Sequence, residues 1–272
     1  MARAKKEIPL RIATWNTNSV RLRFDSLKQL MATENPDVIC LQETKVADEF
    51  FPRDFFIEQG YPHLAIGGQK MWHGVAIASR VPLDGVDARK WCSKQDCRHM
   101  SVRLPGNIEL HNFYVPAGGD IPDPEVNEKF AHKLQFIDEM TEWSRGYKRD
   151  GARTILVGDL NIAPLETDVW SHKQLLRVVS HTPIETARMA TLVEAGGWVD
   201  AMRRFVPPEE KLFTWWSYRS PDWANANKGR RLDHIWVTPD LVPNLRGISV
   251  LKSFRAHEPA SDHVPVLLDM VA

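Results

Sequence analysis

The sequence predicts an α/β fold in which two packed β-sheets are covered by helices. Short apolar runs alternate with amphipathic stretches along the 272 residues, which is typical of α/β proteins. Residues 74–115 are rich in strand-like segments and favour antiparallel pairing as well. Because no long linker interrupts the pattern, we expect a short flexible tail over residues 1–9 and a single domain over residues 10–272.

The first part of the chain predicts a strand, a helix and four further strands. Apolar residues recur at helical spacing from Val20 to Met31, and Asn35-Pro36 should end this helix because the residue before a proline avoids helical geometry. Residues 38–42 are continuously apolar, as in a fully buried strand, and lead directly into Glu43. The other strands are expected at residues 10–16, 74–79, 100–104 and 108–115.

The second part predicts a long helix and four more strands. Phe130, Leu134, Ile137 and Met140 would share one face of a helix over residues 125–146. A buried strand at residues 154–157 runs into the string Gly158-Asp159-Leu160-Asn161. Three further strands are expected at residues 232–237, 248–251 and 264–270.

The composition is typical of a globular protein in a reducing compartment. Lys plus Arg and Asp plus Glu number 35 each, so any nucleic-acid surface must come from a local arrangement of charge. The three cysteines, Cys40, Cys92 and Cys97, are too few for a disulfide framework, and the spacing of the last two with His99 does not favour zinc. We expect no membrane span, no secretory signal and a cytoplasmic location, associated with the nucleoid if the source is bacterial.

Acids and amides fall where the predicted strands begin or end. Burying such groups at a strand edge costs little free energy only when they form hydrogen bonds or ion pairs. Six edges share this feature, which separate accidents would rarely produce. The residues are Asn16, Glu43, Asp159, Asn161, Asp233 and the pair Asp262-His263.

These residue types favour a hard cation and an activated water. Oxygen ligands without cysteine suit Mg²⁺, and Glu43 is the best first ligand. Asp159 and Asn161 alternate across a strand end, so the carboxylate can accept a proton from a water that the amide orients. His263 is a natural partner for a phosphate, and Asp233 would fix its tautomer and favour its charged form.

Each of these residues also has a structural interpretation when it is taken alone. Asp159 after a glycine is a tight turn, and His263 is a packed histidine. Asp233 can pair with Arg230 or Arg231. The combination favours a functional site over these separate explanations.

Seven strings of the chain resemble the exonuclease III family of abasic-site endonucleases, which belongs to the deoxyribonuclease I-like endonucleases, exonucleases and phosphatases. They run in the family's order and cover nearly the whole chain. Gly-Asp-x-Asn and Ser-Asp-His are typical of the superfamily, whereas Leu-Gln-Glu-Thr-Lys, Phe-Thr-Trp-Trp and Arg-Leu-Asp narrow the match to the DNA-repair branch. The strings occupy residues 14–18, 41–45, 112–116, 158–164, 213–220, 230–233 and 261–266.

The resemblance implies a four-layered α/β sandwich of two packed mixed sheets with the site at one edge. It implies Mg²⁺, with Mn²⁺ able to substitute, and a water positioned by Asp159 and Asn161; we favour Asp159 as the proton acceptor. Tyr114 would contact the phosphate. The implied metal ligands are Glu43, Asn18, Asp262, Asp159 and Asn161. The implied catalytic residues are Asp159, Asn161, His263, Asp233, Tyr114 and Asn16.

An aromatic run between two of these strings could pack in the core or could line a substrate pocket. The resemblance favours a pocket in which Trp215 and Leu232 enclose a bare sugar, because an abasic nucleotide leaves the helix at a reduced cost. The implied substrate-binding residues are Lys45, Trp215, Trp216, Tyr218, Arg219, Arg230 and Leu232.

Three positions depart from the family pattern near this pocket. Arg230 stands where relatives place an apolar or aromatic residue, Ala117 where many place an amide, and Asp120 where some place a basic residue. These departures bear on pocket selectivity and on the balance between endonuclease and exonuclease action. They leave the catalytic set intact.

The implied function is metal-dependent hydrolysis of double-stranded DNA on the 5′ side of abasic sites, with 3′–5′ exonuclease and 3′-end-cleaning activity, by a monomer. One alternative is another phosphoesterase of the same fold that acts on inositol phosphates, sphingomyelin or RNA; it should lack the aromatic string at residues 213–220. The other is a non-catalytic DNA-binding relative, which has no reason to keep the full set of acids, amides and histidine.

Overall fold

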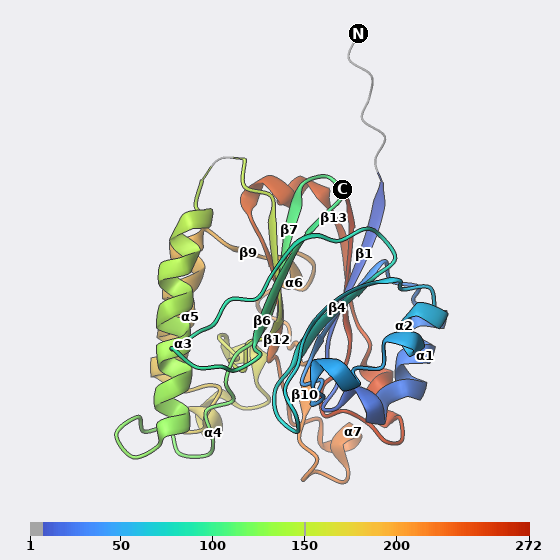
Figure 1. Ribbon diagram of the computed structural model, residues 1–272. Helices are drawn as coiled ribbons and strands as arrows, with labels where there is room; N and C mark the ends of the chain where they lie inside the picture. The colour runs from blue at the N-terminus through green and yellow to red at the C-terminus, as the bar shows by residue number, and fades with distance from the viewer. Residues whose placement is uncertain (1–7, 150) are drawn as a thin grey trace.

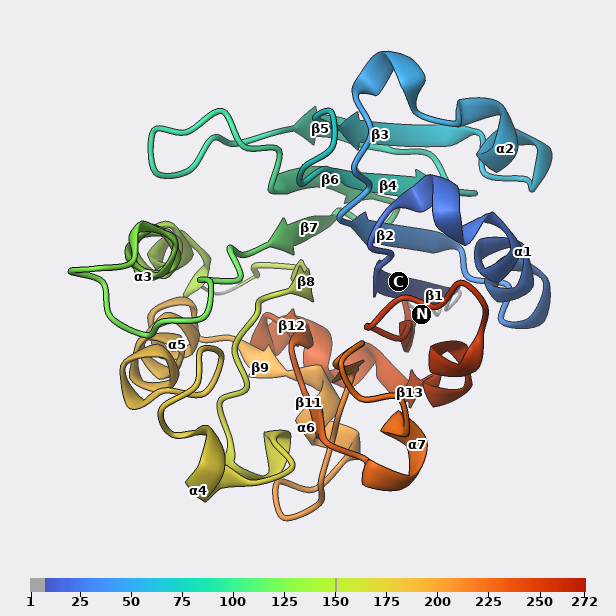
Figure 2. The same cartoon turned by 90° about the horizontal axis from the view of Figure 1, so that it is seen from below.

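The computed structural model describes residues 8–149 and 151–272, and it has the four layers that the sequence predicts. Two mixed six-stranded sheets pack face to face. Helices α1 and α2 cover the outer side of the first sheet, and α3 and α5 cover the outer side of the second (Figures 1 and 2).

The first sheet has the strand order β13-β14-β1-β2-β4-β3. Only β1 and β2 run parallel in it, and every other neighbouring pair is antiparallel. Its strands are β1 (Pro9–Asn16), β2 (Val38–Gln42), β3 (His63–Gly67), β4 (Val75–Ser79), β13 (Leu245–Val250) and β14 (Val266–Val271).

The second sheet has the order β5-β6-β7-β8-β12-β9, with β7 and β8 parallel. A separate two-stranded ribbon pairs β10 with β11. The strands of the second sheet are β5 (Asp84–Asp87), β6 (His99–Leu104), β7 (Ile108–Tyr114), β8 (Thr154–Asp159), β9 (Val199–Asp200) and β12 (Asp233–Val237). The ribbon strands are β10 (Trp215–Trp216) and β11 (Gly229–Arg230).

Helices α1 and α3 each pack through one apolar face. Leu27 and Leu30 of α1 lie in the cluster that covers the first sheet, and Phe136 and Ile137 of α3 lie in the cluster that covers the second. The helices are α1 (Phe24–Thr33), α2 (Arg53–Glu58), α3 (Glu128–Ser144), α4 (His172–Leu175), α5 (Pro183–Gly196), α6 (Ala201–Phe205) and α7 (Trp223–Ala226). The 3₁₀ turns span Val20–Arg23, Asp48–Phe50, Arg145–Tyr147, Glu166–Asp168, Pro239–Asn244 and Lys252–Ala256.

The main core lies between the two sheets. Ile12, Val38 and Leu268 of the first sheet belong to the same buried cluster as Val157 and Ile235 of the second. All five are fully buried, so this layer removes a large apolar area from water and fixes how the sheets face each other.

Most predicted elements are confirmed, with small shifts at their ends. β1 begins at Pro9, which pairs with Val271, whereas residues 1–7 of the predicted tail lie outside the described residues. The last strand begins at Val266 and not at 264, because Pro265 has no backbone N–H to donate to the ladder.

Helix α5 was not predicted, although its start carries clear signals. Pro183 occupies the first turn, and the side chain of Glu185 accepts a hydrogen bond from the backbone N–H of Thr182. Among the described residues, no helix combines the length and the apolar character needed to cross a membrane.

Candidate active site

The polar strand ends predicted from the sequence meet at one end of the sandwich. Asn16 ends β1 and pairs with Gln42, the residue before Glu43, while Asp159 ends β8 opposite Asp233 at the start of β12. In Figure 1 this is the end where α4, β10 and α7 lie. Each sheet therefore supplies acids to the same edge.

Asn16 joins the acids of the two sheets. Its fully buried Nδ2 donates to Glu43 Oε1 at 2.9 Å and to Asp159 Oδ2 at 2.9 Å. One amide group thus donates both of its protons to carboxylates from different sheets. This contact fixes Glu43 and Asp159 relative to each other.

Glu43 is held ionised by its neighbours. Burial by itself raises the pKa of Glu43, but Lys45, whose Nζ lies 2.8 Å from Oε2, and the amide of Asn16 outweigh it, so that the pKa is lowered. Tyr114 also donates its hydroxyl proton to Oε1 at 2.9 Å, and burial beside Glu43 raises the pKa of Tyr114 well above its usual value. Tyr114 is therefore a neutral donor.

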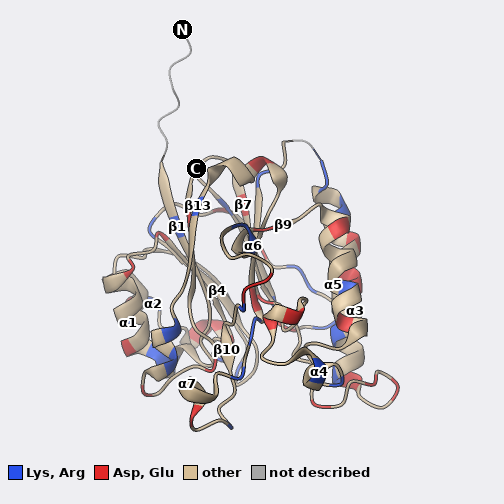
Figure 3. Ribbon diagram, turned by 180° about the vertical axis from the view of Figure 1, so that it is seen from behind, with Lys and Arg blue, Asp and Glu red and all other residues tan. Residues whose placement is uncertain are grey.

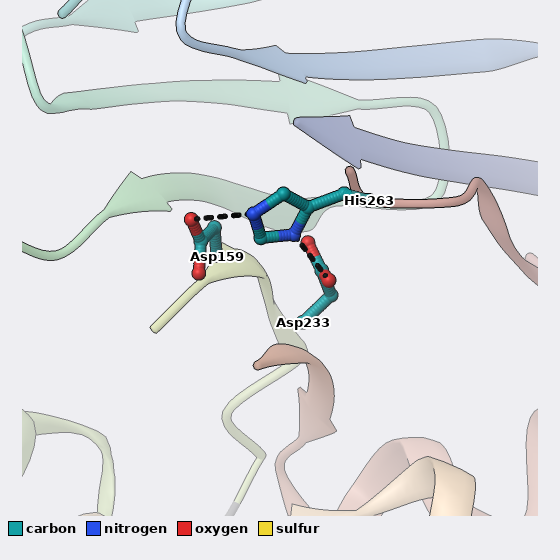
Figure 4. Close-up of side chains that lie close together, drawn as sticks. All are labelled: Asp159, Asp233 and His263. Atoms are coloured by element: carbon teal, nitrogen blue, oxygen red, sulfur yellow. Dashed lines mark hydrogen bonds and ion pairs between the residues drawn. The ribbon is translucent and has the colours of Figure 1, made fainter. Parts of the chain in front are cut away.

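Asp159, His263 and Asp233 form a buried triad (Figure 4). His263 Nδ1 lies 2.8 Å from Asp233 Oδ2, and Nε2 lies 3.6 Å from Asp159 Oδ2. Burial lowers the pKa of His263, but the two carboxylates outweigh this effect and hold the pKa well above its usual value. Burial raises the pKa of Asp159 to about 7 against the attraction of His263. Asp159 can therefore exchange a proton near neutral pH.

The same triad is the one group of described His, Cys, Asp and Glu residues whose ligand atoms all lie close enough to surround an ion, within 4.8 Å of one another. Both nitrogens of His263 face a carboxylate, however, and its raised pKa means that both carry protons. A doubly protonated imidazole has no lone pair for a metal. The triad is better suited to a proton than to a cation, and the oxygen set around Glu43 suits a hard cation better.

Asn161 is locked beside Asp159. Its backbone is left-handed, with φ 54°, and its backbone N–H donates to Asp159 Oδ1 at 2.9 Å. Its Nδ2 donates to Asp159 Oδ2 at 3.0 Å and to the carbonyl of Val115 at 2.9 Å. Asp159 and Asn161 thus form the adjacent acid and amide that the sequence predicts.

Asn18 and Asp262 lie at the rim of the site. Asn18 Oδ1 accepts a hydrogen bond from Lys45, and its Nδ2 donates to the hydroxyl of Tyr218 at 3.2 Å. Asp262 Oδ2 accepts from the indole N–H of Trp215 at 3.0 Å. Lys45 thus links Asn18 to Glu43, and Asp262 lines the same cavity as Glu43.

A cavity of about 750 Å³ opens beside the triad. Trp215 and Leu232 line it together with Arg219, Asn161 and His263. The indole of Trp216 alternates to the other face of β10, where it is buried and donates to Asn227.

Arg230 is fixed in the wall of this cavity. Its guanidinium carbon lies 5.1 Å from the ring centre of Trp215. Its Nη1 donates to the carbonyl of Val179 at 3.0 Å and to Ser180 Oγ at 2.8 Å. The wall of this cavity therefore carries a cation at residue 230. Ala117 and Asp120, the other two departures, also line this cavity.

A second hollow of about 500 Å³ lies on the other side of Glu43. Lys45, Lys94 and Lys129 line it, and Lys and Arg also mark the segments beside α1, β10 and α4 (Figure 3). Arg98 stacks over the ring of Tyr114 at 4.7 Å, a contact that sequence reasoning missed because it depends on how β6 follows the loop before it. Glu43 and Asp96 also line this hollow, so it carries side chains of both signs.

The sequence matches the endonuclease/exonuclease/phosphatase family over residues 13–263. The chain belongs to this family. Exodeoxyribonuclease III of Haemophilus influenzae is 30% identical over 273 residues, which cover 94% of this chain and 98% of that relative.

Solved structures of related proteins agree with this assignment. An AP endonuclease from Archaeoglobus fulgidus superposes with a TM-score of 0.88 at 30% identity, covering 96% of this chain and 99% of the other. A 3′ phosphatase from Neisseria, bound to a product DNA hairpin, superposes with a TM-score of 0.87 at 29% identity and the same two coverages.

In this member of the endonuclease/exonuclease/phosphatase family, most of the predicted site residues come together. Asn16, Glu43, Tyr114 and Asp159 are linked by hydrogen bonds. The structure does not bring Trp216 or Tyr218 to the cavity wall. Tyr218 instead donates its hydroxyl proton to the carbonyl of Ala260 at 2.8 Å and lies between the loops at the rim.

Proposed function

We propose that this chain is a metal-dependent DNA-repair nuclease that hydrolyses the backbone of double-stranded DNA on the 5′ side of abasic sites. We propose in addition that it removes nucleotides and blocking groups from 3′ ends. It would act as a single catalytic domain and as a monomer, in the cytoplasm.

The observation that carries this proposal is the contact of Asn16 with both Glu43 and Asp159. It places a carboxylate suited to a cation next to a carboxylate with a pKa of about 7, which is the combination that hydrolysis of a phosphodiester needs. The family match over residues 13–263 supports the same reaction class.

Some residues of the chain act on the attacking water, and others act on the phosphate. Asp159 takes the proton of the attacking water, which Asn161 orients. His263 carries positive charge because of Asp233, so it stabilises the negative charge that develops on the phosphoryl oxygens. Tyr114, whose hydroxyl donates to Glu43 Oε1 in this structure, would turn that one proton toward the phosphate when substrate binds.

The donor set fits Mg²⁺, with Mn²⁺ able to substitute. Glu43 would be the principal ligand, with Asn18 and Asp262 nearby and with Asp159 and Asn161 on the other side. Lys45 now neutralises Glu43 at 2.8 Å, as a cation in this place would. When bound, the ion would supply Lewis-acid stabilisation of charge on the scissile phosphate.

The cavity beside the triad supports selection of damaged DNA. Trp215 and Leu232 form apolar walls suited to a sugar without a base, with Arg219 and Arg230 at the wall. Lys45 lies beside Glu43. The Neisseria relative is a 3′ phosphatase bound to a product DNA hairpin, which supports action at 3′ ends as well.

A duplex oligonucleotide with a single abasic site tests the proposal. We expect cleavage on the 5′ side of that site in Mg²⁺, no cleavage in a chelator, and recovery in Mn²⁺. An intact duplex with a 3′-phosphate end serves as the second substrate. Hydrolysis of inositol phosphate, sphingomyelin or RNA instead would favour another phosphoesterase. Binding to the duplex without turnover would favour the non-catalytic relative.

A further inference from the structure

A fully buried ion pair lies directly behind the proposed site. Lys133 of α3 and Glu185 of α5 have no exposed side-chain surface, and Lys133 Nζ lies 2.5 Å from Glu185 Oε1. Buried pairs of this kind seldom stabilise a fold more than apolar side chains of the same size would. A contribution to stability is therefore a weak explanation for the presence of this ion pair.

The remaining protons of Lys133 point at the loops of the site. Its Nζ donates to the carbonyl of Asn161 at 2.7 Å and to the carbonyl of Ala117 at 3.2 Å. Asn161 has the left-handed φ of 54°, which asparagine tolerates better than most residues but which still leaves its carbonyl in need of a donor. Lys133 supplies that donor.

The stem of Lys133 also shapes the loop that follows Tyr114. A Cβ added to Gly118 would lie 2.9 Å from Lys133 Cδ, and Gly118 has a φ of +91°. The loop therefore contacts Lys133 through both the carbonyl of Ala117 and the backbone of Gly118.

Glu185 extends the same network to the pocket wall. Its carboxylate accepts from the backbone N–H of Ser180 at 2.9 Å and from the backbone N–H and hydroxyl of Thr182 at 3.1 and 2.7 Å. The hydroxyl of Ser180 in turn accepts a hydrogen bond from Arg230, which stacks on Trp215. One ion pair therefore contacts three segments around the site: residues 117–118, Asn161 and residues 180–182.

We propose that Lys133 is a positioning residue for phosphodiester hydrolysis, and that Glu185 holds it in place. It fixes the Asn161 backbone, and with it the amide beside Asp159, without touching substrate. This inference rests on the proposed function. Because Lys133 is buried, its loss should lower kcat and leave KM little changed.

The test is the double variant Lys133→Met/Glu185→Gln. It removes both buried charges together, and the second substitution keeps an oxygen for the N–H groups of Ser180 and Thr182. We expect kcat on an abasic duplex to fall about 10²-fold, as small misplacements in a site commonly cause. KM should stay near the wild-type value.

Leu30→Ala is the control. Leu30 of α1 is fully buried in the cluster that covers the first sheet, and this cluster contains no residue of 115–119 or 160–163. The substitution should lower the unfolding midpoint with an unchanged kcat. A wild-type kcat in the double variant, or an equal loss of kcat in Leu30→Ala, would overturn the proposal.

A measurement without DNA separates this inference from the proposed function. Amide hydrogen exchange of peptides covering residues 115–119 and 160–163 should be faster in the double variant than in Leu30→Ala. Unchanged exchange there would refute the positioning role even if wild-type protein cleaves DNA. Should the double variant not fold, Glu185→Gln alone replaces it, and a wild-type kcat in that variant would also reject the role.

Discussion

At the scale of single residues, the neighbours of each acid decide what it can do. Glu43 and Asp159 accept hydrogen bonds from the same amide, yet Lys45 lowers the pKa of the first and burial raises that of the second. One carboxylate stays ionised, which suits a cation. The other can gain and lose a proton near neutral pH, which suits a base.

Removing the charge of Glu43 should weaken the response to metal. For Glu43→Gln we expect the Mg²⁺ concentration at half-maximal rate to rise by at least about tenfold, since even outer partners of a metal ligand matter that much. Metal-titrated cleavage of an abasic duplex measures this. Glu49→Gln, at an exposed acid nearby, is the control. An unchanged titration in Glu43→Gln would remove it from the ligand set.

Asp159→Asn should remove the proton acceptor while it keeps the shape of the site. We expect kcat to fall by roughly 10²–10⁴-fold, the usual contribution of general-base catalysis. Single-turnover cleavage rates measure the effect. The exposed Asp240→Asn should behave as wild type. If Asp159→Asn cleaves at the normal rate, another group takes the proton.

At the scale of elements, short strands decide which side chains face the substrate. The β10–β11 ribbon has two residues in each strand, so neighbouring tryptophans must point to opposite sides. Trp215 lines the cavity, and Trp216 packs against Phe213 and Trp223 in the core. Trp216 therefore packs as the core interpretation predicts, whereas Trp215 faces the cavity, and its part in a substrate pocket stays a prediction.

Trp215→Ala should lower the preference for abasic sites more than it lowers the rate of phosphodiester hydrolysis. We expect the preference for abasic over intact duplex to fall roughly tenfold or more, because a pocket wall is lost while the triad stays. Competition assays with both duplexes measure the ratio, and Trp215→Phe should retain most of it. An unchanged preference in the alanine variant would place the sugar elsewhere.

β12 also carries a buried neutral histidine that should make stability depend on pH. His234 Nε2 lies 2.8 Å from the carbonyl of Ile162, and Nδ1 is buried without a partner. Burial, with Arg231 and Arg203 nearby, lowers the pKa of His234 to about 3, against the attraction of Asp168. Below pH ~6.5 the unfolded chain takes up a proton that the folded chain refuses.

The sign of this effect follows from that difference in bound protons. The contribution is complete above pH ~6.5 and is lost as the pH falls toward ~3, at on the order of 1 kcal/mol per pH unit. His234→Gln should give a shallower fall in the free energy of unfolding between pH 6.5 and 4.5. Urea unfolding at several pH values measures the slopes, and equal slopes would assign the effect to other groups.

At the scale of the whole molecule, the site depends on how the two sheets face each other. Glu43 comes from the first sheet and Asp159 from the second, and the core between them sets their separation. Any change in sheet packing should therefore reach the site. The fold and the site share one determinant, the apolar layer between the sheets.

Leu268→Ala tests the strength of that layer. Leu268 is fully buried between the sheets, so its truncation should lower the free energy of unfolding by about 2–5 kcal/mol. Leu22→Ala, at a position 59% exposed, should change it by less than about 0.5 kcal/mol. Urea unfolding measures both. A loss at Leu268 no larger than at Leu22 would mean that the layer is loosely packed.

The sequence by itself determined the class of fold, most strands and the identity of the acids and amides. Apolar runs such as residues 38–42 specify buried strands locally, and the residue that follows each run is visible without a structure. The same local signals predicted Asp159 beside Asn161. Local signals also indicate the start of α5, which was not predicted, because Pro183 and Glu185 are typical of a helix N-terminus.

Only the tertiary structure decided which of these groups touch. The bridge from Asn16 to Glu43 and Asp159, the stacking of Arg98 on Tyr114, and the contact of Lys133 with Asn161 join residues far apart in the chain. Local patterns carry no information on such pairs, because the register and packing of two separate sheets set their distances. The shifted pKa values follow for the same reason: burial and charged neighbours exist only once the sheets have closed.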